Sequence, residues 1–273
     1  MNKLLNNLIA FLSMSLLTIG SVSSQCSVDN KYFQAGEQLS YDLYIKFAAT
    51  IKGGYATMST KSVKYEGKDA YKMTLISESQ GFARKVFELS DTLACYTTKG
   101  VLPLAYFKDA HEGGDYTKER LTYSYPGGND VRIRAIRHKN GDFKFDETLN
   151  FSGCTYDLMS VLFYARTLNY PQMAIGKETK VNFVTGRSKV SMRIVYNGKE
   201  SVKANDNKKY NCMKLTLYIQ DDAFDGGKEA MKVYITDDDN RMPVKLETKL
   251  KVGSTRAVLK SYKGVKHPVN IVK

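Results

Sequence analysis

The sequence predicts a mainly β protein in which a strongly curved sheet wraps around, or is capped by, a single apolar helix. Two observations lead to this fold class. Apolar and polar residues alternate through most of the chain, which is the period of a strand with one buried face, whereas only one long segment has helical spacing. The chain also has 19 tyrosines and no tryptophan, a composition that suits half-buried strand surfaces.

Strand patterns run from the N-terminal third to the end of the chain. Leu39, Tyr41, Leu43 and Ile45 alternate with polar residues, and we expect a turn at Gly53-Gly54 before the next strand. Further strands are expected at 55–65, 71–78, 91–98, 101–108, 116–125, 130–138, 142–151, 179–185, 188–196, 200–204, 210–219, 230–236, 241–252 and 254–262. Asn140-Gly141, Asn197-Gly198 and Asp238-Asp239-Asn240 are typical turn sequences between them.

The helical segment is expected at about 156–168. Its apolar stripe consists of Leu158, Val161, Leu162, Ala165 and Leu168. Asp157 suits the positive end of the helix dipole and Arg166 the negative end, and Pro171 follows the segment. Because a lone apolar helix among strands must be widely covered, we expect it to be central. The stripe then forms either the core or the lining of a ligand site.

The first 24 residues have the features of a secretory signal peptide. Lys3 supplies the positive charge, residues 8–20 are largely apolar, and 22–24 offer a small-residue cleavage site. We therefore expect a signal peptide at 1–24, followed by one β-rich domain at 25–273. The destination would be the periplasm or cell envelope. The apolar run is shorter than the about 20 residues of a membrane span, and no later segment approaches that length, so the mature chain is expected to have no transmembrane segment.

Four cysteines lie at positions 26, 95, 154 and 212. An even count in an oxidising compartment permits disulfides, and no CxxC or Cys/His metal spacing is present. We favour Cys26 with Cys154, because each lies at the edge of a structural element rather than inside a strand. A lipid anchor on Cys26 is the less favoured alternative, because the preceding Gln25 is not a small residue.

The formal net charge of +13 limits the choice of partners. Lysines are spread along the strand-like segments, and an exported protein rarely meets nucleic acid, so we expect no nucleic-acid partner. The densest basic cluster, at Arg132, Arg134, Arg137, His138 and Lys139, is interpreted as the solvent face of one strand. Binding to anionic lipid headgroups is the alternative interpretation of this cluster.

No motif for catalysis, metal binding or a cofactor is evident. The histidines at 111, 138 and 267 lack metal spacing, and there is no GxSxG or SxxK nucleophile motif. Acidic clusters at 221–225 and 237–240 are interpreted as turns. Calcium ligands and paired glycosidase carboxylates are the alternatives. We therefore expect neither an enzyme nor a cofactor.

Three segments resemble an exported bacterial family known as domain of unknown function 3108, most closely its Bacteroidetes-type members. They are 33–41, 154–166, and 236–244 with 252–254. The resemblance spans about 33–262 and implies a curved antiparallel sheet or incomplete β-barrel against which the 156–168 helix packs. It implies no catalytic residues.

The function expected first is a non-enzymatic envelope protein that holds a lipid or other hydrophobic group in its curved sheet. This rests on fold analogy. A structural or protein-interaction module of the envelope, with no ligand site, is the alternative. A polysaccharide-acting enzyme is a second, less favoured alternative.

Overall fold

The structure, a computed structural model, describes residues 26–46, 49–219, 229–249 and 253–272. The predicted signal peptide lies outside these residues. The described strands form one 15-stranded sheet. They are β1 (Gln38–Lys46), β2 (Thr50–Tyr65), β3 (Lys68–Ser79), β4 (Leu89–Thr97), β5 (Pro103–Glu112), β6 (Asp115–Gly127), β7 (Asp130–Lys139), β8 (Asp142–Ser152), β9 (Thr155–Tyr156), β10 (Glu178–Thr185), β11 (Ser188–Lys203), β12 (Lys209–Ile219), β13 (Glu229–Thr236), β14 (Pro243–Lys249) and β15 (Ser254–Lys263).

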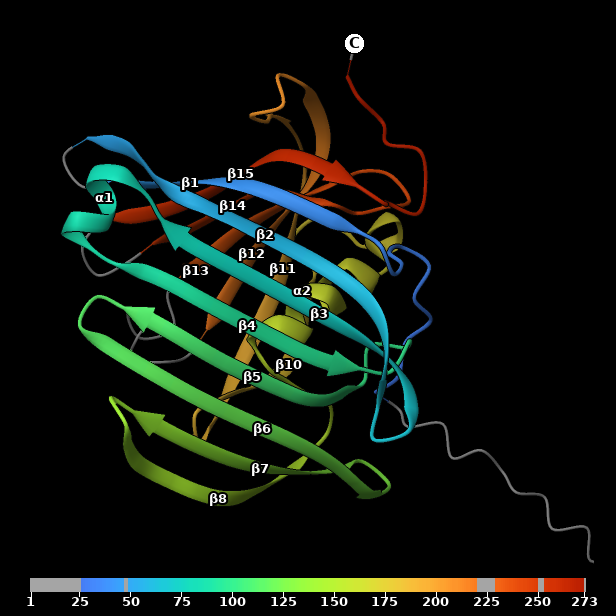
Figure 1. Cartoon of the computed structure of the whole chain (residues 1–273). Coiled ribbons are helices and arrows are strands. Elements are labelled where there is room, and N and C mark those ends of the chain that lie inside the picture. Colours follow the sequence, from blue (N-terminus) through green and yellow to red (C-terminus); the bar gives the residue numbers. More distant parts are fainter. Residues whose placement is uncertain (1–25, 47–48, 220–228, 250–252, 273) are drawn as a thin grey trace, which may run out of the picture.

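The sheet curves into a nearly closed barrel (Figure 1). Strands β1 to β8 pair in sequence order, β1 also pairs with β15, and β15 to β10 continue the sheet in reverse order to β9. Every described pairing is antiparallel except that of β9 with β10. The chain passes directly from β8 to β9, which are the two ends of the sheet, so these ends meet. The predicted fold class, a curved antiparallel sheet or incomplete barrel, is confirmed.

Side chains connect the two edges of the barrel at this seam. The guanidinium of Arg187, in the β10–β11 turn, lies 2.7 Å from the Glu147 carboxylate of β8. The Asn182 amide of β10 donates a hydrogen bond to the Ser152 carbonyl of β8 at 3.0 Å. The barrel is therefore closed here by side-chain contacts rather than by a ladder of backbone hydrogen bonds.

Two predicted turns are wrong. Gly53-Gly54 lies inside β2, where β3 comes so close that a Cβ on Gly54 would lie 1.9 Å from the Glu78 carbonyl oxygen. Asn197-Gly198 lies inside β11, where it forms an irregularity in the pairing with β12. The turn predicted at Asn140-Gly141 is present, with φ of +54° and +88°.

Helices in the described chain are few and short. They are α1 (Gly81–Val86), α2 (Leu158–Thr167) and the 3-10 helix η1 (Tyr170–Gln172). Helix α2 lies within the predicted segment and runs inside the curve of the sheet (Figure 1). The described residues contain no helix long and apolar enough to cross a membrane.

Helix α2 divides the barrel core into two clusters. Its Met159 and Phe163 pack with fully buried residues of β1 and β3–β7, among them Leu39 and Leu121. On its other side, Val161 and Ala165 pack with side chains of β10–β13. The helix thus fills one part of the interior with close-packed apolar groups.

Candidate functional site

Another part of the interior is an apolar cavity of about 730 Å³. One wall comes from β1–β3, with Leu43, Met58 and Leu75, and the opposite wall comes from β12–β15, with Leu217 and Val233. Alternation along each strand turns these side chains to the concave face. Because β1 pairs with β15, residues from both ends of the sequence line one space.

Helix α2 forms the floor of this cavity through Leu162 and Ala165. The predicted apolar stripe is therefore divided. Val161 and Ala165 are buried, whereas Leu158, Leu162 and Leu168 are only partly buried. Full burial of the whole stripe, as a packed core requires, is not observed. Leu162 keeps an apolar surface toward the cavity instead.

The N-terminus of α2 is fixed by Asp157. Its carboxylate accepts hydrogen bonds from the backbone N–H groups of Met159 and Ser160, at 2.9 and 2.8 Å, and the Ser160 hydroxyl closes a capping box. The Tyr123 hydroxyl of β6 donates to the same carboxylate at 3.2 Å. Burial raises the pKa of Asp157 to about 6, although these donors oppose the shift.

The C-terminal end of α2 is fixed by two arginines. The Arg166 guanidinium donates to both Glu37 carboxylate oxygens, at 2.6 and 2.8 Å, and to the Asn240 carbonyl at 2.8 Å. Arg241 donates to the carbonyls of Arg166 and Leu168, which are free at a helix end. The floor of the cavity is thus tied to the residue before β1 and to the β13–β14 turn.

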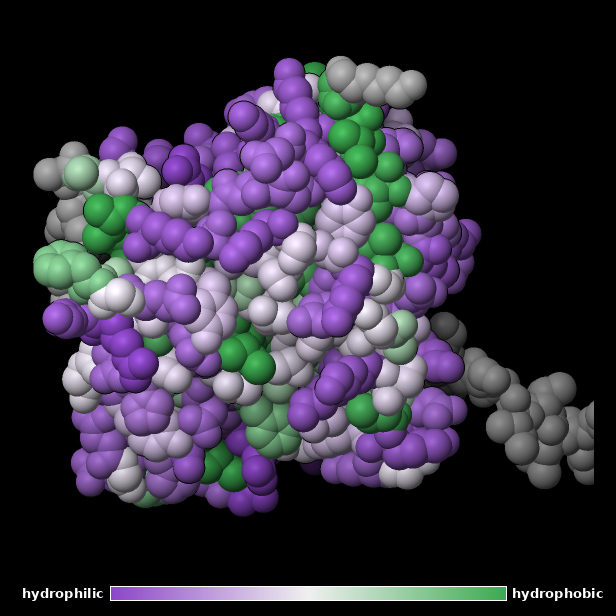
Figure 2. All heavy atoms as spheres, turned by 45° about the horizontal axis from the view of Figure 1, so that its top comes forward, coloured by the Kyte–Doolittle hydropathy of each residue, from purple (hydrophilic) through white to green (hydrophobic). Residues whose placement is uncertain are grey.

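Apolar side chains also surround the open end of the cavity. Phe87, next to α1, and Ile51 of β2 line it and are themselves partly exposed, and the nearby Phe82 of α1 is 72% exposed. Figure 2 shows hydrophobic atoms at the end of the molecule that carries α1, beside largely hydrophilic strand surfaces. An apolar path therefore leads from the surface into the cavity.

One side of the cavity is charged rather than apolar. Asp91 of β4 lies on the concave face, next to Ser77 of β3, which lines the cavity. Glu112 of β5 also lines it and is bound by Lys108 at 3.1 Å. Burial, followed by the nearby Glu112 carboxylate, raises the pKa of Asp91 to about 7.

The basic cluster of β7 is only partly on the solvent face, contrary to prediction. Arg132 and Arg134 are exposed, but Arg137 points to the concave face and binds the buried Glu119 of β6 at 2.6 Å. The strand alternation places Arg137 in phase with the buried Ala135. The cluster therefore does not form a single basic surface.

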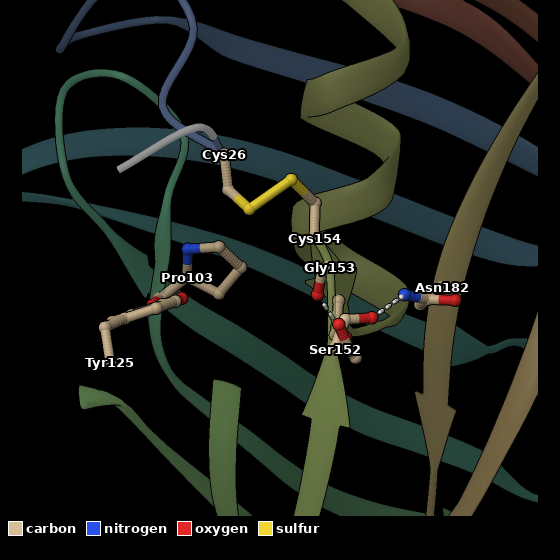
Figure 3. Close-up of a disulfide and its surroundings, with 8 residues drawn as sticks. Cys26, Pro103, Tyr125, Ser152, Gly153, Cys154 and Asn182 are labelled. Atoms are coloured by element: carbon tan, nitrogen blue, oxygen red, sulfur yellow. Dashed lines mark hydrogen bonds between the residues drawn. A yellow bond between two sulfur atoms is a disulfide. The ribbon is translucent and has the colours of Figure 1, made fainter. Parts of the chain in front are cut away.

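Cys26 and Cys154 form a disulfide, as predicted, with Cα atoms 5.2 Å apart (Figure 3). It ties the segment before β1 to the short link between β8 and β9, beside the Asn182–Ser152 hydrogen bond. A disulfide is consistent with export to an oxidising compartment.

The acidic segment 237–240 is a turn, as predicted. The Asp238 carboxylate accepts hydrogen bonds from the Thr236 hydroxyl and from the backbone N–H groups of Asn240, Arg241 and Asn270. The other acidic cluster, 221–225, lies outside the described residues. No group of three or more metal-ligating side chains occurs in the part of the chain that the structure describes.

Sequence reasoning missed the concave charges Asp91 and Glu112. A signal was present, since Asp91 alternates in phase with the buried Leu93 and Cys95, and Glu112 with Ala110. A charged residue at an inward strand position is uncommon, because its burial requires a partner. Helix α1, whose Ala83 lines the cavity, was also missed.

Fold and site together define a nearly closed β-barrel with an internal helix and an apolar cavity open at one end. The chain belongs to the DUF3108 family, described as "Protein of unknown function", whose model matches residues 40–260. The predicted resemblance is thus confirmed, and the family itself assigns no activity. No curated protein matches the chain significantly.

One solved structure supports the fold, and two others show weaker similarity. A β-barrel-like protein of the domain of unknown function DUF1849 from Brucella abortus matches with a TM-score of 0.60 and 8% identity, covering 88% of this chain and 100% of that chain. A Bacteroides fragilis protein described as exported, with a YmcC-like fold, has a TM-score of 0.34 and 13% identity, covering 87% and 100%. A Parabacteroides distasonis protein described as a lipoprotein has a TM-score of 0.32 and 13% identity, covering 88% and 100%.

Proposed function

We propose that this chain is a non-enzymatic envelope protein that holds the apolar part of a lipid, or of a similar hydrophobic molecule, inside its barrel. The observation that carries the proposal is the cavity of about 730 Å³. Its volume lies within the range of about 300–1,000 Å³ that is usual for small-molecule sites, and its walls are mostly apolar, as such sites are. Binding would remove both the ligand and the lining side chains from water.

The exposed apolar groups at the mouth support this role. Phe82 and Phe87 are large apolar residues near the opening, and exposed apolar surface that continues into a cavity is typical of binding sites. They would give an acyl chain a path from a membrane or another protein into the barrel.

The two free cysteines make poor nucleophiles, which supports a non-enzymatic role. Burial raises the pKa of Cys212 to about 12, and burial also raises the pKa of Cys95 well above its usual value. Thiols in such surroundings remain protonated and inert.

Native mass spectrometry of the protein purified from its own host, followed by organic extraction, tests the proposal. We expect a non-covalent adduct that is extracted into organic solvent. The Ala257→Phe substitution places a ring in the cavity and should abolish the adduct. Thr92→Phe adds the same ring to the exposed face of β4 and should leave the adduct in place.

Absence of an adduct, together with no uptake of an apolar dye by the wild-type protein, would contradict the proposal. It would favour a structural or interaction module. An adduct retained equally by Ala257→Phe would place the ligand outside the cavity. Thermal melting followed by circular dichroism verifies that both variants are folded.

A further inference from the structure

The concave face beside the cavity carries a row of charges. Opposite residues of an antiparallel pair share a face, and the register aligns Lys108 of β5 with Glu119 of β6 and Glu119 with Arg137 of β7. The same face holds Asp91 on β4, one register step from the Lys108 row toward the cavity mouth, and Glu112 on β5, two steps from it. Near the cavity this face therefore holds three carboxylates, of Asp91, Glu112 and Glu119, and two cations, of Lys108 and Arg137. Farther along the same face, the carboxylates of Asp115 and Glu147 are bound by Lys139 and Arg187.

The two cations are already paired with two of the carboxylates. Arg137 binds Glu119 at 2.6 Å, and Lys108 donates to both oxygens of Glu112 at 3.1 Å. Asp91 is only 8% exposed, and its Oδ1 atom is buried without a hydrogen-bond partner among the described residues. A buried acceptor without a donor is costly, so it marks a place where a further donor would bind favourably.

Asp91, which carries this unpartnered oxygen, lies next to the cavity. Residues paired with or next to Asp91 on the same face, Ser77 and Leu89, line the cavity, as does Glu112. On another wall, Arg256 of β15 also lines the cavity, opposite Tyr44 of β1. Its Nε atom is buried without a hydrogen-bond partner among the described residues, and its guanidinium lies 5.1 Å from the Tyr44 ring centroid. The side of the cavity formed by β3–β5 therefore presents carboxylates.

We propose that the ligand of the cavity is an amphiphile whose polar end carries an N–H-bearing cation, an alkylammonium group, bound between Asp91 and Glu112. Its apolar chain extends along the cavity toward Leu162. An ammonium group supplies donors to the free Asp91 oxygen and balances the surplus negative charge. A carboxylate or phosphate at the same place would meet like charge. This inference rests on the proposed function, since it names the polar end of the same ligand.

Calorimetric titration with decylamine, decanoic acid and decanol tests the inference, because the three probes share one chain and differ in the head. At about pH 8, amine and acid are charged and Asp91 is ionised. We expect decylamine to bind about tenfold or more tightly than decanol, as a charge-assisted hydrogen bond to a buried group allows, and decanoic acid to bind more weakly than decanol.

Variants then test whether Asp91 causes the preference for decylamine over decanol. In Asp91→Asn, decylamine should lose its advantage over decanol, while decanol binds as in the wild type. Glu112→Gln should reduce the same advantage. Asp109→Asn is the matched control, because it removes one carboxylate from the exposed face of β5 and should change nothing. Melting temperatures verify that each variant is folded.

Lysophosphatidylethanolamine and lysophosphatidylcholine distinguish the sources of the ammonium group. Preference for the ethanolamine lipid indicates a phospholipid with N–H donors, whereas binding of decylamine alone indicates a simpler amine. Equal binding of the three decyl probes, or a preference for amine that survives Asp91→Asn, would overturn the inference but leave the proposed function standing. Failure of all probes to bind would count against the proposed function itself.

Discussion

Arg166 of α2 and Glu37, the residue before β1, form a bidentate ion pair in the barrel interior, with side chains only 1% and 2% exposed. The pair joins residues 129 positions apart and sets where α2 lies against the sheet. Since Leu162 and Ala165 belong to the same helix, the pair also positions the floor of the cavity.

Breaking this ion pair should lower the stability of the protein. Glu37→Gln leaves the Arg166 charge buried without its counter-charge, and we expect a loss of about 3–5 kcal/mol in the free energy of unfolding. Urea unfolding followed by circular dichroism measures it. Removing both charges, as Glu37→Leu with Arg166→Met, should restore much of the loss because apolar groups replace the pair.

The exposed pair Lys64–Asp69, with O–N distance 2.8 Å, provides the control. Asp69→Asn should leave stability nearly unchanged, as is usual for exposed ion pairs. If Glu37→Gln had no greater effect than Asp69→Asn, the pair would not hold the helix in place.

The disulfide should stabilise the barrel through the long loop it closes. Cys26 and Cys154 are 128 residues apart in sequence, and loss of a native disulfide from a secreted domain typically costs about 2–5 kcal/mol. The double substitution Cys26→Ser with Cys154→Ser should therefore lower the melting temperature. A reductant should lower that of the wild type to a similar extent.

The double variant is its own control, since a reductant should not affect it further. Intact mass after alkylation of the unfolded, unreduced protein provides a second measurement. Only the thiols of Cys95 and Cys212 should react. Reaction of all four thiols would contradict the disulfide.

Much of the fold could be predicted because local periodicity carries it. The alternation at Leu39, Tyr41 and Leu43 predicts β1. The apolar stripe predicts a helix at 156–168, and α2 lies within that range. The failures at Gly53-Gly54 and Asn197-Gly198 have a tertiary cause. Glycine is needed in β2 because β3 comes close to Gly54, a contact between strands that the sequence alone does not reveal.

The cavity itself could not be predicted. Its walls combine β1–β3 with β12–β15, and whether apolar side chains meet or leave a space between them depends on the curvature of the whole barrel. The same limit applies to Asp91. The alternation of β4 indicates that Asp91 points inward. However, Lys108 could have paired with either Asp91 or Glu112, and only the structure shows that it pairs with Glu112.

Leu162 should contribute less to stability than a packed core leucine. Leu121 is fully buried, so Leu121→Ala should cost about 2–5 kcal/mol. Leu162 is partly exposed to the empty cavity, so Leu162→Ala removes fewer contacts and should cost less. Denaturant unfolding of the two variants gives the comparison. Equal losses would show that Leu162 packs as core.

Asp91 should make stability depend on pH in a direction opposite to that of most carboxylates. Its pKa is raised from 3.8 to about 7 in the folded protein by burial, then by the Glu112 carboxylate, with Lys108 opposing. Between these values the folded state keeps a proton that the unfolded state has lost. The contribution of Asp91 to stability is therefore fully present below about pH 4 and is lost as the pH rises through about 7.

Asp91→Asn, which cannot ionise, should remove this loss. The melting temperature of the variant relative to the wild type should rise between about pH 4 and pH 7 and then level off. Asp157, whose pKa is about 6, titrates in the same range in both proteins and cancels in the difference. Asp109→Asn, on the exposed face, should show no such rise. A difference between Asp91→Asn and wild type that is constant with pH would mean that Asp91 ionises normally, with a partner that satisfies its charge.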